Sequence, residues 1–564
     1  MPNSLNKLAH FACVTALAAL LIGCGAPKPA TSPDEPAPAG NPAAAVPAGQ
    51  AETPVDGDAL VENIEAEPPT LNLLLATSDA RSQYIGRNVF DLLLELDLDS
   101  LEMKPSLATT WEISDDHLHY TFHLRNDVKF TDGVPLTTKD VKATIDLIMD
   151  PANDTAELRN YLQDIESIDV IDDFTIRFNM KRTYFRHLLV LGDFPIVPAH
   201  IYATGDLGKN PANRAPIGSG PYIFEKWDTG SQIALKRNEN YWGKKPYLTQ
   251  RIFKIIPDNN AAFQAVERHD IDMQDIPAEQ WVRKTNTEKF QKEFQKLVLD
   301  SQVPGYLSRF NYIGWNMRKP QLADKRVRQA LCMLFDRQQI IDKVFYGFGT
   351  IATTDVFFKS PDSNTNLKPW PFDPERAKKL LDEAGWTDSD SDGVRDKDGV
   401  KLEFDLSYAS SVPEYDQLGA VYQEELRRAG IRMTLNPIEW ATFAVRVQER
   451  KFDACMLAWM TVPFYDGYQL WHSTQATDGS NYPGFINAEA DKLMEDARVE
   501  FDPAKRKILN DRFQEILHDE QPYIFLYHRP GLVALDARFR GVKVHTMGIE
   551  PKEWWVPADL QRYK

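Results

Sequence analysis

Strand-like and helix-like segments alternate along the chain from about Leu60 onward, and this alternation limits the possible folds more than any other feature. Residues 120–124 alternate in side-chain polarity with the period of two of a half-buried strand. Thr138 is the predicted N-cap of one helix, and residues 373–375 (Asp-Pro-Glu) begin another that ends at Gly385. We therefore expect a mixture of helices and strands, without a short repeat of the solenoid kind.

The bulk composition is that of a soluble globular protein, with 43% hydrophobic and 26% charged residues in a chain of 564. A chain of this length forms two to four domain-sized units and buries a core without disulfides. The formal net charge of −18 repels phosphate backbones and anionic membrane surfaces. The sequence therefore excludes nucleic acid as a partner.

The four cysteines form no metal-binding or redox motif. Cys13 lies in the N-terminal apolar segment, whereas Cys332 and Cys455 lie within apolar stretches of the body. Buried free thiols are predicted at the latter two positions, with a disulfide between them as the alternative. No CxxC motif and no Cys/His cluster indicates zinc.

Residues 1–23 are predicted to be a lipoprotein signal peptide. Lys7 precedes an apolar run over residues 11–22, which is too short to span a bilayer and has the length of a signal-peptide core. The run ends in Leu-Ile-Gly before Cys24, and this ending resembles the bacterial lipobox. Cys24 is therefore the predicted lipidation site, where two acyl chains give stable anchoring. An ordinary signal peptide with a chance cysteine is the alternative.

Residues 24–56 are predicted to be a disordered tether. The segment consists of Pro, Ala, Gly and a few polar residues, with too few large apolar side chains to offset the entropy lost on ordering. An anchored tether ahead of a globular body is typical of a receptor near a membrane, and equally of a lipoprotein enzyme.

An ordered series of short motifs follows the tether. The motifs are 104–108 (KPSLA), 111–116 (WEISDD), 120–125 (YTFHLR), 128–133 (VKFTDG), 217–222 (IGSGPY), 237–243 (RNENYWG), 256–258 (IPD), 315–316 (WN), 324–331 (DKRVRQAL), 377–386 (AKKLLDEAGW), 480–485 (SNYPGF) and 521–523 (QPY). In this order they resemble the extracellular solute-binding proteins of family 5, the dipeptide and oligopeptide receptors. Each motif alone is weak evidence for the family, but the ordered set is specific to it and covers nearly all of the chain after the tether.

The resemblance implies an α/β fold, a type II periplasmic-binding-protein clamshell of two lobes in its large three-subdomain variant. Lobe I is discontinuous: it comprises residues 57–308, with an extra subdomain at about 91–215, and returns over residues 525–564. Lobe II comprises residues 309–524. Two chain crossovers form a hinge, which permits closure around a ligand.

The resemblance also implies a function, that of the substrate-binding component of an ABC importer. The expected ligand is a peptide or peptide-like solute, and the expected partners are a permease and an ATPase. We expect a monomer held outside the cytoplasm by a lipid anchor in a bacterial membrane, without a cofactor. A relative binding an oligosaccharide or a metal chelate is the first alternative. A lipoprotein hydrolase is the second, but the sequence lacks HExxH, GxSxG and GxxxxGK[ST], so we expect no enzyme.

The resemblance places the ligand between the lobes, where main-chain hydrogen bonds accept peptides of varied sequence. The implied ligand-binding residues are Thr77, Ser78, Asp79, Tyr312, Trp315, Trp459, Val462, Asp466, Asn481 and Tyr482. The aromatic members either stack on a ligand or pack in a core, and the sequence leaves both open.

The chain departs from the family pattern at the two ends of a bound peptide. Peptide receptors of this family carry an aspartate three residues after the tryptophan that corresponds to Trp459, where it pairs with the ligand's α-amino group; here the residue is Val462. Asp466 is the candidate replacement. The arginine that clamps a dipeptide's carboxylate has no counterpart in residues 410–415. The sequence is therefore also compatible with a longer peptide, a peptide with blocked ends or a non-peptide ligand.

One acidic loop is a candidate calcium site. Asp388, Asp390, Asp392 and Asp396 take positions 1, 3, 5 and 9 of an EF-hand-like loop, and the backbone carbonyl of Val394 takes position 7. Position 12 is a glycine rather than the bidentate glutamate, so a solvated acidic turn is the alternative. Either role is structural.

Overall fold

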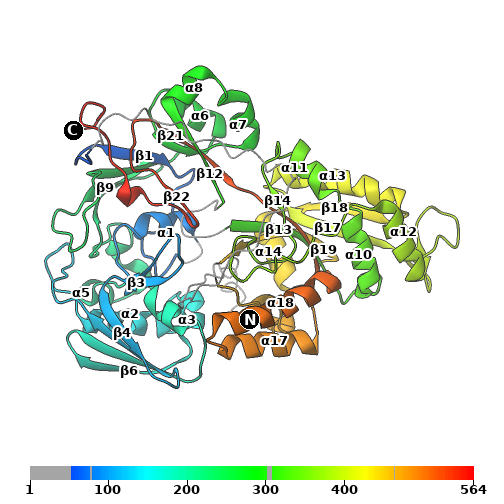
Figure 1. Cartoon of the computed structure of the whole chain (residues 1–564), viewed down its shortest axis with the longest axis horizontal. Helices are drawn as coiled ribbons and strands as arrows, with labels where there is room; N and C mark the ends of the chain where they lie inside the picture. Colours follow the sequence, from blue (N-terminus) through cyan, green and yellow to red (C-terminus); the bar gives the residue numbers. More distant parts are fainter. Residues whose placement is uncertain (1–52, 77–78, 301–307, 463, 564) are drawn as a thin grey trace, which may run out of the picture.

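The computed structural model, drawn in Figure 1, describes residues 53–76, 79–300, 308–462 and 464–563. Cys24 with the predicted signal peptide, most of the predicted tether, and the predicted ligand contacts Thr77 and Ser78 lie outside the described residues. Within the described part, no helix combines the length and apolar character needed to cross a membrane.

A mixed seven-stranded sheet forms the centre of the part that we call lobe I. Its strand order is β12-β21-β11-β1-β10-β9-β8, with β1 parallel to β10 and β11 and the remaining pairs antiparallel. The strands are β1 (Ala59–Asn63), β8 (Tyr222–Asp228), β9 (Gln232–Arg237), β10 (Gln250–Lys254), β11 (Met273–Asp275), β12 (Phe294–Leu299) and β21 (Gly531–Asp536). Neighbouring residues of β1 enter different cores, Val61 beside Phe263 and Leu60 beside Trp554, because successive strand side chains face opposite ways.

A smaller antiparallel sheet, in the order β4-β5-β7-β6, completes lobe I. Its strands are β4 (Ala108–Ile113), β5 (His119–Leu124), β6 (Ile165–Asp172) and β7 (Thr175–Met180). Phe122 of β5 shares one hydrophobic core with Tyr222 and Phe253 of the large sheet, so the two sheets form one packed body. The predicted strand over residues 120–124 is confirmed.

Helices α1 (Ala80–Gly86), α2 (Thr138–Met149), α3 (Ala156–Leu162), α4 (His187–Gly192), α5 (Ala199–Tyr202), α6 (Asn259–Glu267), α7 (Ala278–Lys284) and α8 (Glu288–Glu293) belong to lobe I. The N-cap predicted for α2 is wrong by one residue. Thr137, not Thr138, caps the helix, because the carboxylate of Asp140 accepts the backbone N–H of Thr137 at 2.9 Å and completes a capping box.

A six-stranded sheet in the order β14-β20-β13-β19-β17-β18 forms the centre of the part that we call lobe II, on the right in Figure 1. Its strands are β13 (Ser308–Trp315), β14 (Thr350–Ile351), β17 (Glu403–Ala409), β18 (Arg432–Ile438), β19 (Ala454–Thr461) and β20 (Tyr523–His528). Tyr312 and Ile313 of β13 enter different cores on the two faces. Cys332 and Cys455 are buried free thiols in these separate cores, as predicted.

Lobe II also contains α9 (Pro320–Ala323), α10 (Lys325–Met333), α11 (Arg337–Lys343), α12 (Pro374–Glu383), α13 (Pro413–Arg428), α14 (Trp440–Gln448), α15 (Tyr468–Trp471), α16 (Gln475–Asp478), α17 (Ala488–Val499) and α18 (Pro503–Glu520). The predicted beginning of α12 is confirmed, since Asp373 accepts the backbone N–H of Arg376. Gly385, just beyond the helix, has a φ of +86°, a conformation that glycine adopts without strain.

The chain passes between the lobes twice, from β12 to β13 and from β20 to β21. This arrangement gives the two-lobed α/β clamshell that the motifs predict. The exact lobe boundaries stay predictions.

Three two-stranded sheets complete the fold of the described residues: β2 (Leu94–Leu96) with β3 (Met103–Pro105), β15 (Asp396–Lys397) with β16 (Val400–Lys401), and β22 (Val544–His545) with β23 (Gly548–Ile549).

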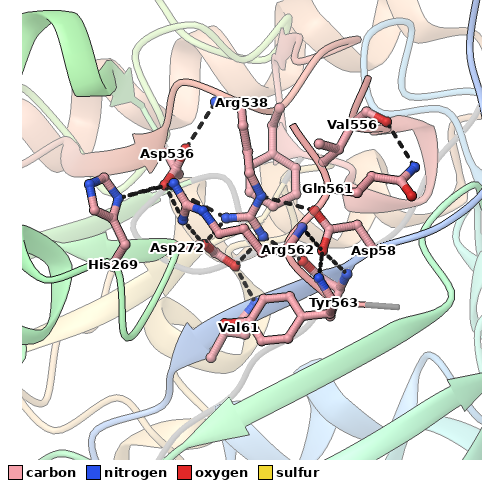
Figure 2. A network of polar contacts seen from close by, with 12 residues as sticks. Asp58, Val61, His269, Asp272, Asp536, Arg538, Val556, Gln561, Arg562 and Tyr563 are labelled. Carbon is pink, nitrogen blue, oxygen red and sulfur yellow. Dashed lines mark hydrogen bonds and ion pairs between the residues drawn. The ribbon is translucent and has the colours of Figure 1, made fainter. Parts of the chain in front are cut away.

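A buried charge network fastens the C-terminal segment to lobe I (Figure 2). The guanidinium of Arg538, only 4% exposed as a residue, forms ion pairs with Asp58 at 3.0 Å and with Asp272. Arg562 pairs with Asp536 at 2.6 Å, and the backbone N–H of Tyr563 donates to Asp58 at 2.9 Å. We call Asp58, Asp272, Asp536, Arg538 and Arg562 the tail network. It joins the first strand of the body to the last residues of the chain.

Candidate ligand-binding site

One edge of the lobe II sheet meets the connections between the lobes. Strand β17 runs parallel to β18 and β19, so the carboxyl ends of all three strands lie at the same edge. The beginning of β13 joins this edge, because Ser308 pairs with Thr461 at the end of β19. Ligands of open α/β sheets bind beyond the carboxyl ends of parallel strands, so this edge is the candidate site.

The structure brings three predicted aromatic residues together beside this edge. The ring of Trp459 lies nearly parallel to Tyr312, at 6.5 Å between centroids, and to Tyr482, at 6.0 Å. Tyr312 in turn stacks on Tyr523 at 3.9 Å. All four side chains are buried in one core of lobe II. In this conformation they pack against one another, which is the second of the two roles that the sequence leaves open.

Two further predicted contacts, Trp315 and Asn481, are fully buried. Trp315 lies on the other face of β13, where it packs edge-on against Phe404. The amide of Asn481 donates to the carbonyls of Trp471 and Phe485, so it holds the backbone of its own loop. Both residues therefore stabilise the fold of lobe II in this conformation, since neither side chain reaches solvent.

Asp79 begins a helix. Its carboxylate accepts hydrogen bonds from the backbone N–H of Ser82 at 2.7 Å and from the Ser82 hydroxyl at 2.8 Å, which makes Asp79 the N-cap of α1.

Val462 is half-buried directly after β19. Phe464, two residues later, packs against the core of lobe I, so the segment after β19 reaches across to the other lobe.

Asp466 is a predicted site residue whose carboxylate contacts side chains of both lobes. Its carboxylate accepts a hydrogen bond from the Tyr184 hydroxyl at 2.6 Å and forms an ion pair with Arg498 at 3.2 Å. Arg186 lies at 4.0 Å. Tyr184 and Arg186 belong to lobe I, whereas Asp466 and Arg498 belong to lobe II. Cationic groups of the chain itself thus surround this carboxylate, and a cationic end of a ligand would compete with them.

Further contacts accompany Asp466 across the junction of the lobes. The backbone N–H of Phe185 donates to the carbonyl of Arg498 at 3.0 Å, and the guanidinium of Arg506 lies over the Phe185 ring at 4.2 Å. His117 stacks on Phe501 at 3.6 Å. We call Tyr184, Phe185, Arg186, Asp466 and Arg498 the interlobe latch. Local sequence signals missed it, because its contacts between the lobes join residues far apart in the chain, such as Tyr184 and Asp466.

Three of the four predicted carboxylates of the acidic loop lie close together. Ligand oxygens of Asp388, Asp390 and Asp392 lie within 4.8 Å of one another, and all three residues are exposed. The backbone N–H of Gly393 donates to Asp388 at 3.1 Å, which fixes the turn. The geometry is compatible with either sequence interpretation, a calcium loop or an acidic turn.

Lys401 of β16, which no motif in the sequence singles out, extends its ammonium to this loop. The ammonium of Lys401 is 2.7 Å from Asp390, 3.0 Å from Asp392 and 3.6 Å from Asp396, and it donates to the Val394 carbonyl at 3.5 Å. These carboxylates raise the pKa of Lys401. An ammonium of the chain thus contacts four of the five predicted calcium ligands and supplies positive charge there.

Comparisons with known proteins agree on one family. The sequence profile of the bacterial extracellular solute-binding proteins, family 5, matches residues 102–481. The oligopeptide-binding protein AppA of Bacillus subtilis is 32% identical over 520 residues, which cover 89% of this chain and 92% of AppA. Its structure in complex with a nonapeptide covers 90% of this chain and all of that one, with a TM-score of 0.75 and 30% identity. The structure of NikA from Brucella suis in complex with Fe(III)-EDTA covers 88% of this chain and all of that one, with a TM-score of 0.77 and 26% identity. The chain belongs to the bacterial extracellular solute-binding proteins of family 5.

Proposed function

We propose that this protein is the substrate-binding component of an ABC importer and that it captures a peptide or peptide-like solute between its lobes. The likeness to AppA carries the proposal, because AppA is an oligopeptide-binding protein and the match extends over nearly the full length of both chains. A likeness of this extent includes both lobes and the connections between them, which together form the binding unit.

Capture follows from the two-lobed architecture. A solute that contacts both lobes favours the closed arrangement by its differential affinity for it, and a permease distinguishes the closed shape from the open one. The interlobe latch supports this mechanism. The contacts that Tyr184 and Arg186 of lobe I make with Asp466 of lobe II are polar, so water can replace them when the lobes separate.

The protein acts outside the cytoplasm, as members of an extracellular solute-binding family do. We propose in addition that Cys24 carries a lipid anchor, that the segment after it is a tether, and that the protein works as a monomer with a permease and an ATPase. The apolar run before Cys24 and the Pro/Ala-rich composition after it support the anchor and the tether. Replacing Cys24 with alanine should abolish acyl labelling and detergent partitioning; unchanged labelling would contradict the anchor.

Mass spectrometry of the solute that co-purifies with the protein tests the proposed ligand class. The chain without residues 1–24 is purified natively, unfolded to release its ligand, and compared with the same protein after unfolding and refolding. We expect peptides in the released fraction, and a smaller radius of gyration by X-ray scattering when the refolded protein is loaded again. A tightly bound solute that causes no compaction would contradict capture by closure.

A metal chelate is the second candidate ligand. It is favoured by Val462, which replaces the aspartate expected in peptide receptors, and by the likeness to NikA, whose structure contains Fe(III)-EDTA. Elemental analysis of the same released fraction separates the candidates. Stoichiometric iron or nickel without peptide would support the chelate and contradict the peptide.

A further inference from the structure

We propose that Arg309 and Asn311 form a subsite for an anionic group of the ligand, most simply a carboxylate, at the edge of lobe II. This inference rests on the proposed function, because it assumes that the protein captures a solute between its lobes. The two residues are two positions apart on β13, so their side chains project from the same face of the sheet.

Both residues present hydrogen-bond donors without an acceptor. Asn311 is 2% exposed, and its Oδ1 accepts from the Tyr415 hydroxyl at 3.3 Å, but its Nδ2 has no partner in the described part of the chain. The Nε of Arg309 is likewise buried without a partner there. Buried polar groups in folded proteins are nearly always satisfied, so two unsatisfied donors on one face of β13 call for an acceptor beyond the described residues.

The charges around the two donors favour an anion. Arg529 lies close by, and its guanidinium pairs with Glu414 at 3.2 Å. Burial raises the pKa of Tyr415, and the positive charges of Arg309 and Arg529 both oppose that rise, so both cations act on the same hydroxyl. Glu414 neutralises one of these cations, whereas no carboxylate of the described residues lies within ion-pair distance of Arg309. One positive charge therefore remains for a ligand.

The position of the pair agrees with a ligand contact. Arg309 is the second residue of β13, directly after the connection from lobe I, and it pairs with Met460 near the end of β19. Arg529 directly follows β20 on the second connection. The cationic groups thus lie where both connections enter lobe II, at the carboxyl-end edge of its parallel strands. The whole chain carries a net charge of −18, so a general excess of cations does not explain them.

The ligand class follows from these donors. A guanidinium and an amide donate together to a carboxylate, which belongs either to the C-terminus of a peptide or to an acidic side chain. The arginine that clamps a dipeptide's carboxylate in peptide receptors of this family has no counterpart in residues 410–415. Arg309 would bind the carboxylate from β13 instead, a strand far from those residues in the sequence.

The test uses two synthetic peptide pools of the same randomised nonapeptide composition, one with free C-termini and one amidated. Each pool is mixed with the refolded, ligand-free chain, separated by gel filtration, and the retained peptides are sequenced by mass spectrometry. We expect at least tenfold more retained free acid than amide. Retained amides enriched in Asp or Glu at one position would assign the subsite to a side-chain carboxylate instead. Equal retention of both pools, without acidic enrichment, would contradict the subsite.

Two variants connect the preference to the residues. Arg309→Met removes the charge, and Asn311→Asp replaces the unsatisfied donor with an acceptor of the same shape; both should abolish the preference for acids. Arg428→Met, on the exposed surface of α13, is the matched control and should keep it. A preference that survives in Arg309→Met, at an unchanged melting temperature, would contradict the proposal. Retention of neither pool by the wild type would contradict the peptide ligand itself, which is a separate result.

Discussion

The tail network and the interlobe latch use the same chemistry in two different mechanical settings. Each places aspartate carboxylate groups beside two arginines: the tail network pairs Asp272 and Asp536 with Arg538 and Arg562, whereas the latch places the single Asp466 beside Arg186 and Arg498. Every member of the tail network belongs to lobe I, whereas the members of the latch come from both lobes. We therefore expect the ion pairs of the tail network to persist in the folded protein and those between the lobes to break when the lobes separate.

The two settings predict different thermodynamic consequences. Removing one partner inside a single folded body leaves a buried charge without a counter-charge, and the unfolding free energy falls. Removing one partner across a hinge lets the remaining charge reach water by opening, so the change is seen in the open–closed equilibrium instead. Variants on each side test this distinction.

Arg538→Met should have the largest effect. It leaves Asp58 and Asp272 buried without their common cation, and we expect a loss of about 3–5 kcal/mol in the free energy of unfolding. Denaturant titration measures it, with Arg428→Met as the control at an exposed ion pair. A loss no larger than that of the control would show that Arg562 and solvent replace Arg538.

Asp355 sharpens the comparison, because it is a buried carboxylate that pairs with no arginine of the described residues. The hydroxyl of Tyr465 and the indole of Trp471 donate to it, and burial raises its pKa to about 6. Because the pKa of Asp355 is higher in the folded protein than in the unfolded chain, protonation of this carboxyl group favours the folded state. That contribution is fully present below pH 3.8 and is lost as pH rises through 6, by about 3 kcal/mol in total.

The measurement for Asp355 is the difference between the unfolding free energies of the wild type and Asp355→Asn from pH 3.5 to pH 7. We expect the wild type to lose stability relative to the variant as the pH rises, since asparagine does not titrate. A flat difference across this range would mean that the carboxylate does not change protonation there.

Tyr184→Phe should affect the latch moderately. It removes the hydroxyl that donates to Asp466, a bond to a charged group worth about 1.5–3 kcal/mol when buried. We expect weaker ligand binding, by about tenfold, and a larger radius of gyration in the ligand-free protein, with little change in denaturant stability. Tyr468→Phe is the matched control, because its hydroxyl contacts only Thr474 among the described residues.

Asp466→Asn separates the latch from the ligand contact that the sequence suggests for Asp466. If Asp466 acts in the latch, scattering shows a more open protein even without ligand. If it binds the ligand's cationic end, the ligand-free protein is unchanged and only binding weakens. Compaction and affinity both equal to the wild type would contradict both roles.

Local signals predicted local structure well. The polarity pattern of residues 120–124 and the Asp-Pro-Glu start at residue 373 were sufficient, because strand period and helix capping depend on near neighbours. The two-lobed fold came from an ordered set of motifs. The latch could not be predicted, because Tyr184 and Asp466 are 282 residues apart and neither belongs to a motif. Trp315 and Asn481 illustrate the same limit, since burial depends on packing that sequence position does not reveal.

Lys401→Met should produce the smallest effect, at the acidic loop. Lys401 supplies positive charge to Asp390 and Asp392, so its removal leaves like charges close together and should lower the melting temperature slightly. We propose that calcium then replaces the ammonium, because the same oxygens suit a hard cation. Binding to the folded state alone raises the melting temperature. Calcium should therefore stabilise Lys401→Met more than the wild type, and EDTA should reverse the gain. Asp390→Ala in the same background is the control, and an equal response there would show that calcium binds elsewhere.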